Sequence, residues 1–110
     1  MTYQEIKTMI EGVGVPFAYY QFPETGQTPP FICFYYSDDN DPKADNTNYA
    51  KIERLVIELY TAEKEFELEA AIERTLKNAE LSWSKNEVYI DSEKMIMNVY
   101  ETDVIINERS

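Results

Sequence analysis

The chain has 110 residues, a net charge of −11 and 44% apolar residues, which suits one globular domain rather than two. This acidic excess disfavours tight binding to nucleic-acid phosphates and to anionic membrane surfaces, because both are held by Lys and Arg. The absence of histidine and the single cysteine, Cys33, exclude an internal disulfide, a Cys/His metal site and the commonest general base.

The first segment predicts a helix over residues 2–12. Thr2 and Glu5 have the spacing of a capping box, and apolar residues recur from Tyr3 onward at helical intervals. Gly12 and the residues after it end the helix. The charges near the N-terminus are unlike a signal peptide, and no apolar run reaches the roughly 20 residues of a membrane span, so we expect a cytosolic protein without membrane contact.

Three strands are predicted next, over residues 17–22, 31–36 and 48–61. Cys33 lies in the second of them, where we interpret it as a small buried side chain. In the third strand, Leu55 and its neighbours alternate between two faces, but the apolar face changes near Lys51. Such a change indicates a bulge or a strand that leaves the sheet, so we expect a long hairpin whose distal half projects.

The tip of this hairpin is the polar stretch SDDNDPKADNTN, residues 37–48, which we expect to be flexible. A calcium loop needs alternating oxygen ligands, Gly at its sixth position and Glu at its twelfth. Counting from Asp39 gives Ala44 and Ala50 at those two positions, and counting from Asp41 ends at Ile52. A hairpin tip is the favoured interpretation, because Asp and Asn form turns.

A second helix is predicted over residues 63–79, and strands over residues 81–90 and 94–106. On the helix, the stripe containing Ile72 and Leu76 should face the core. The charged residues should face solvent, and Glu73 and Lys77 should form an i,i+4 ion pair. The charged residues of this face are Glu65, Glu69, Glu73, Arg74 and Lys77. The resulting order α-β-β-β-α-β-β predicts an α+β fold, with a mostly antiparallel sheet and two helices packed against it.

No pattern indicates catalysis. The neighbouring carboxylates lie on faces that we expect to be exposed, and no glycine-rich phosphate loop is present. We therefore predict no enzyme, no catalytic residues, no cofactor and no metal. The remaining class of function is association with other protein chains through apolar side chains that a monomer would leave exposed to solvent. The predicted subunit or partner interface consists of Tyr35, Tyr36, Tyr49, Ile52, Met95, Met97 and Val99.

The interface prediction has an open alternative. Met95, Met97 and Val99 share a face of the last strand with Glu101 and Asp103. The first helix could cover the apolar end of that face and make it part of the core.

The sequence resembles the tail-completion, or head-to-tail joining, proteins of long-tailed phages and of prophages in Gram-positive bacteria. The resemblance begins with MTYQEIKTMIEGVGVPFAYYQFPE and continues through PPFICFYY and NYAKIERLVIELYT. It ends with ELEAAIERTL and WSKNEVYIDSEKMIMNVYETDVII, and so covers nearly the whole chain.

The resemblance implies a fold similar to that of tail terminators and a structural role without catalysis. It further implies a homo-oligomeric ring, commonly of six subunits, that joins the tail tube to the head connector. DNA would pass through the lumen of such a ring without specific binding, which agrees with the acidic composition. The expected location is the virion, and the host bacterial cytoplasm during assembly.

Two other functions stay open at this point. A small acidic, Tyr-rich monomer could act as a binding module or inhibitor of a basic host protein. A metal-dependent enzyme would have to be stabilised substantially by calcium or magnesium.

Overall fold

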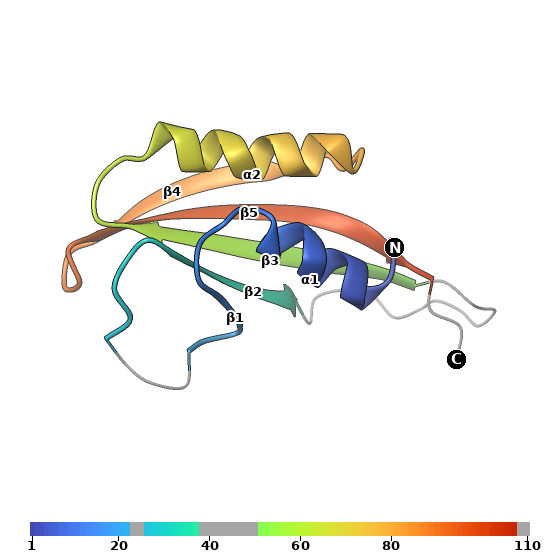
Figure 1. Cartoon of the computed structure of the whole chain (residues 1–110), viewed down its shortest axis with the longest axis horizontal. Helices are drawn as coiled ribbons and strands as arrows, with labels where there is room; N and C mark the ends of the chain where they lie inside the picture. Colours follow the sequence, from blue (N-terminus) through green and yellow to red (C-terminus); the bar gives the residue numbers. More distant parts are fainter. Residues whose placement is uncertain (23–25, 38–50, 108–110) are drawn as a thin grey trace.

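The computed structural model describes residues 1–22, 26–37 and 51–107, and it confirms the predicted α+β fold and element order (Figure 1). Two helices and five strands follow one another in the order α1, β1, β2, β3, α2, β4 and β5. Their bounds are Tyr3–Glu11, Phe17–Tyr19, Phe31–Ser37, Lys51–Thr61, Phe66–Asn78, Ser84–Ile90 and Met95–Ile106.

The strands form one sheet in the order β1-β2-β3-β5-β4. Among the strands of the described residues, β1 and β2 pair in parallel and the other pairs are antiparallel. The last strand, β5, therefore lies inside the sheet and separates β3 from β4. Its pairing with β3 is unbroken from Lys51 opposite Ile106 to Thr61 opposite Ile96.

Both helices pack on the same face of the sheet. Ile6 and Ile10 of α1 and Ile72 and Leu76 of α2 belong to one buried cluster with inward side chains of β2, β3 and β5. Burying each of these apolar side chains contributes about 1.5–3 kcal/mol. The cluster makes this face the hydrophobic core, and neither α1 nor α2 lies on the other face of the sheet, which we call the helix-free face.

The start of α1 forms as its sequence predicts. The Thr2 hydroxyl accepts a hydrogen bond from the Glu5 backbone N–H, and the Glu5 carboxylate accepts one from the Thr2 N–H. Just before the helix, the Met1 amino group donates to the Ile105 carbonyl at 2.9 Å, and the Asn107 N–H donates to the Met1 carbonyl. These bonds fix the beginning of α1 to the end of β5, and Figure 1 shows the N-terminus next to the end of that strand.

The strand β1 is shorter than predicted, because it ends at Tyr19 instead of residue 22. Tyr20 has a φ of 72°, a left-handed conformation that cannot continue a strand. Tyr19 packs against Phe34 on the helix-covered face, whereas Tyr20 stacks on Tyr35, which points to the other face. The chain thus crosses the edge of the sheet at Tyr20.

The change of apolar face in the third strand indicated a bulge or a departure from the sheet, and neither is found in β3 between Lys51 and Thr61. The uninterrupted pairing keeps Lys51–Arg54 in the sheet, where Glu53 faces the helix side at the start of α1. Its carboxylate accepts a hydrogen bond from the Tyr3 hydroxyl at 2.6 Å and lies 3.5 Å from the Lys51 ammonium. These partners allow a carboxylate to occupy an inward position at the end of the core.

The pairing of β2 with β3 is described from Phe31 opposite Tyr60 to Ser37 opposite Arg54. Residues 38–50 lie outside the described residues; they include Tyr49, the predicted hairpin tip 37–48 except Ser37, and most of the stretch considered as a calcium loop. The projection and the flexibility of the tip therefore stay predictions.

Candidate interaction surface

The helix-free face of the sheet is made of rows of side chains that cross the strands. Directly opposite residues of paired strands point to the same face, with Cβ atoms about 5 Å apart. One row consists of Val88, Met97, Tyr60 and Phe31, and the next consists of Asn86, Val99, Glu58 and Cys33. A third contains Ser84, Glu101, Val56 and Tyr35.

The methionine end of this face is not covered by α1, because α1 packs on the opposite face. Met95, Met97 and Val99 are each partly exposed. Val88, which lies opposite Met97 on β4, is 39% exposed. The first helix therefore does not cover these side chains, and they form an apolar surface outside the core. We call this surface the methionine patch; it consists of Met95, Met97, Val99 and Val88.

The other predicted interface residues are divided between locations. Tyr35 joins the helix-free face in the row next to Val99. Ile52 is 61% exposed on that face, but it lies opposite Ile105 at the far end of the sheet. Tyr36 is on the helix-covered face, where its ring contacts Tyr3 of α1 at 5.2 Å between centroids. The structure therefore brings Tyr35 and the methionine patch onto one surface and excludes Tyr36 from it.

Charged residues separate the two apolar ends of the helix-free face. Arg54 on β3 lies opposite Asp103 on β5, and its guanidinium contacts Asp103 at 3.0 Å and Glu101 at 3.3 Å. All three side chains are more than 40% exposed. Exposed ion pairs of this kind contribute little to stability. Their position makes them the polar border of the methionine patch.

Next to the methionine patch lies a pocket of about 580 Å³, which we call the Glu58 pocket. Glu58 is partly buried, and its carboxylate accepts hydrogen bonds from the hydroxyls of Tyr60 at 2.8 Å and Tyr35 at 3.4 Å. Phe31 stacks on Tyr60, with ring centroids 4.8 Å apart, and Tyr20 stacks on Tyr35 at 5.1 Å. Two pairs of aromatic rings thus surround one carboxylate.

The negative charge of Glu58 affects the groups around it. Burial and then the hydrogen bond to Glu58 raise the pKa of the Tyr60 phenol well above its usual range. Burial and the same charge raise the pKa of the Tyr35 phenol and of the Cys33 thiol. These groups stay protonated at neutral pH, so none of them competes with Glu58 as an anion.

A second cluster of charges was missed by the sequence analysis. Glu69 of α2, predicted to face solvent, is only 2% exposed and points into the sheet. One of its oxygens accepts hydrogen bonds from the ammonium groups of Lys64 and Lys85, each at 2.9 Å, and the other accepts one from the Asn98 amide at 3.0 Å. The prediction was wrong because Glu69 precedes Ile72 by three residues and Leu76 by seven, which places it on the buried stripe.

Glu73 was also predicted to face solvent, and it too turns toward the sheet. Its carboxylate accepts hydrogen bonds from the Tyr100 hydroxyl at 2.9 Å and from Lys85 at 2.8 Å. No Glu73–Lys77 ion pair is found among the residues that the structure describes. The sequence contained a signal of these contacts. Asn98 and Tyr100 lie at positions of β5 that point to the helix-covered face, and buried polar groups need hydrogen-bond partners.

This buried network should give a pH-dependent stability. Burial, the largest effect, raises the pKa of Glu69, but the hydrogen bonds and charges of Lys85 and Lys64 outweigh it, so that the pKa lies below its ordinary value of 4.5. A lowered pKa adds stability that is complete above the ordinary value and is lost as the pH falls through the folded-state value. The pKa of Lys85 is raised above 10.5, because its bonds to Glu69 and Glu73 outweigh burial, so its contribution is lost only as the pH rises through that raised value.

We therefore expect urea unfolding at about pH 7 and about pH 3 to separate the wild type from Glu69→Gln more strongly at the higher pH. The difference between their free energies of unfolding should shrink as Glu69 becomes protonated. An equal difference at both pH values would contradict the ionised network.

Two further findings bear on binding. No helix in the described parts of the chain combines the length and the apolarity that a membrane crossing needs. Across residues 1–22, 26–37 and 51–107, no three Cys, Asp or Glu side chains gather in a way that could hold a metal ion.

The helix-free face, with the methionine patch and the Glu58 pocket, is thus the surface on which a functional argument can be built. Comparison of the sequence with protein-family models gives no match, and comparison with curated proteins gives none either.

Proposed function

We propose that this protein is a structural virion assembly protein that forms a homo-oligomeric ring at the head–tail junction of a long-tailed phage. In this role it completes the tail and joins it to the head connector, without catalysis. The observation that carries the proposal is the methionine patch on the sheet face that neither α1 nor α2 covers. Contiguous apolar surface of this kind marks a protein interface.

The composition of the patch fits a protein partner. Met and aromatic residues are enriched in interfaces, while exposed charges gather at their rims. Met97 lies opposite Tyr60, which stacks on Phe31, and the exposed charges of Arg54, Glu101 and Asp103 lie further along the same face. The resemblance to tail-completion proteins supplies the kind of assembly, since those proteins commonly form rings between tail tube and head.

The charge of the chain supports passage of DNA through such a ring. Six copies would bring together many more acids than bases, because each copy carries a net charge of −11. A lumen of negative sign repels phosphates, so that DNA slides through without being held.

Self-association is the first test. The molar mass of the purified protein, measured by light scattering over a range of concentrations, should rise above the 12.9 kDa of one chain. Addition of tail tubes should promote the same assembly if the ring closes on its docking partner. A protein that stays monomeric under both conditions would contradict the proposal.

Assembly of virions is the second test. Electron micrographs of phage particles made without this protein should show tails and filled heads that fail to join. Normal virions would contradict the role. Recovery of a basic host protein in a pull-down, together with normal virions, would instead favour the inhibitor function.

A further inference from the structure

The Glu58 pocket contains a carboxylate that has no cationic partner among the described residues. Its oxygens accept hydrogen bonds from Tyr60 and Tyr35, and no ion pair of Glu58 is found in the described parts of the chain. By contrast, Glu69 binds two lysines, and Glu101 and Asp103 share Arg54. A partly buried carboxylate among aromatic rings favours an incoming positive charge.

The rings of the pocket define the kind of cation. Tyr20 and Tyr35 form one stacked pair and Phe31 and Tyr60 the other, and the row of Glu58 lies between the rows of Tyr35 and Tyr60. Ring faces attract cations, and a guanidinium both stacks on them and donates to a carboxylate. The pocket, at about 580 Å³, has room for an arginine side chain.

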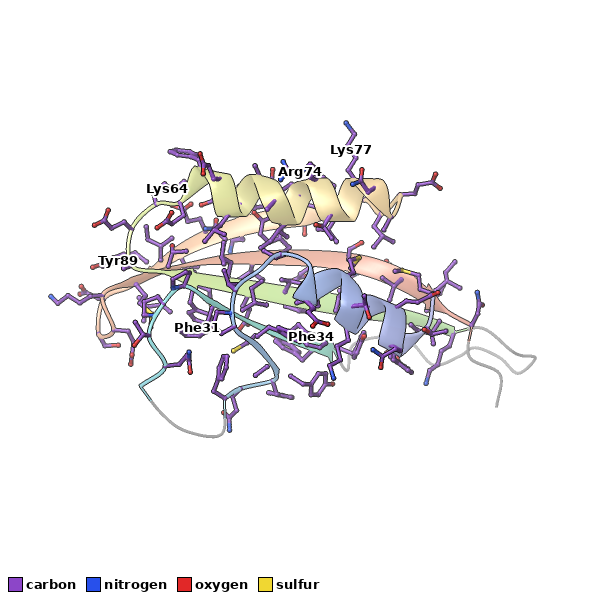
Figure 2. All side chains as sticks on the ribbon, in the orientation of Figure 1. Phe31, Phe34, Lys64, Arg74, Lys77 and Tyr89 are labelled. Atoms are coloured by element: carbon purple, nitrogen blue, oxygen red, sulfur yellow. The ribbon has the colours of Figure 1, made fainter. Side chains whose placement is uncertain are left out.

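A suitable cation is present on the opposite side of the same molecule. Arg74 and Lys77 are exposed on α2, three residues apart and therefore on one side of the helix. Figure 2 shows Lys77 extending from α2 away from the sheet. Neither residue has an ion pair within the described residues, whereas Arg54, Lys64 and Lys85 are each bound to carboxylates.

We propose that Arg74 of one copy enters the Glu58 pocket of a second copy. The guanidinium donates to the Glu58 carboxylate and stacks on the Tyr35 or Tyr60 ring. This inference rests on the proposed self-association and names one contact within it.

The positions of the two partners determine the geometry of assembly. Arg74 lies on the outer side of α2, and Glu58 lies on the sheet face that α2 does not cover. One contact therefore uses different surfaces of the two copies. In a pair, the copy that supplies Arg74 keeps an empty Glu58 pocket, and the copy that supplies the pocket keeps an unused Arg74. Such head-to-tail contacts continue until they close into a ring or extend into a filament.

The first experiment removes each charge and keeps a polar side chain, with Glu58→Gln also keeping the shape of the glutamate. Glu58→Gln and Arg74→Gln should each weaken self-association in sedimentation equilibrium by about tenfold or more, because the remaining partner is left unpaired. Glu63→Gln and Lys7→Gln, at exposed positions on other parts of the chain, serve as matched controls and should associate like the wild type. Thermal unfolding of every variant shows whether it is folded.

The second experiment exchanges the charges. Glu58→Arg and Arg74→Glu should each abolish association, because like charges then meet. A mixture of the two variants should associate with the two variants in alternation, since one is positive and the other negative at both contact positions, so that opposite charges meet at every contact. The double variant should recover association of the wild-type kind.

The outcomes separate this inference from the proposed function. If the wild type associates and both Gln variants associate equally well, the Arg74–Glu58 contact is wrong while the ring proposal stands. If only Glu58→Gln weakens association, the cation comes from another residue and the assignment of Arg74 is wrong. If the wild type never associates, the ring proposal itself fails.

Discussion

Replacing Glu69 with alanine is expected to lower the free energy of unfolding by about 3 kcal/mol. The substitution removes the common acceptor of Lys64, Lys85 and Asn98, and it leaves the Asn98 amide buried without this partner. The two lysine side chains are about one-third exposed, so they can turn toward water, which limits the loss to the lower end of the range for broken buried pairs.

Urea unfolding followed by circular dichroism measures this effect. Glu67→Ala is the matched control, since it removes an exposed carboxylate from the same turn of α2 and should change stability by less than about 0.5 kcal/mol. Equal effects of the two substitutions would contradict a structural role of the buried carboxylate.

Replacing Met97 with aspartate is expected to abolish self-association while the fold persists. Met97 is in the centre of the methionine patch, with Val88 on one side and Tyr60 on the other. A charge placed there would be desolvated in the assembly without a partner, at a cost of several kcal/mol, which corresponds to a loss of at least a hundredfold in affinity.

Sedimentation equilibrium and thermal unfolding together test this prediction. Met97→Leu should associate like the wild type, because it keeps an apolar side chain of similar volume. Ser92→Asp adds the same charge in the exposed turn between β4 and β5 and should leave association nearly unchanged. Unchanged association of a folded Met97→Asp protein would exclude the methionine patch from the interface.

The periodicity of the sequence was enough to predict the fold class. The capping box at Thr2 and Glu5 marks the start of α1, and the alternation around Leu55 marks the inward face of β3. Such signals are local, because they depend on residues a few positions apart. The order of the strands is not local, and the position of β5 between β3 and β4 has no signature in the chain.

The parts of the site that could not be predicted depend on that order. Lys85 and Asn98 reach Glu69 only because β4 and β5 lie under α2. Tyr36 was assigned to the same surface as Tyr35, because a strand that is apolar throughout does not show which of its faces a helix covers. The apolar end at Met95, Met97 and Val99 was predicted from the alternation of the last strand, while the Glu58 pocket required the connector after β1 to be placed.

The central position of β5 has a consequence for how the protein is made. On a ribosome, β3 and β4 emerge before β5, and in the finished sheet each of them is bonded to β5. Until β5 is available, β3 presents one unpaired edge and β4 has no neighbour in the sheet. Nascent chains on neighbouring ribosomes could pair through these edges, so slow translation of the last segment would favour aggregation.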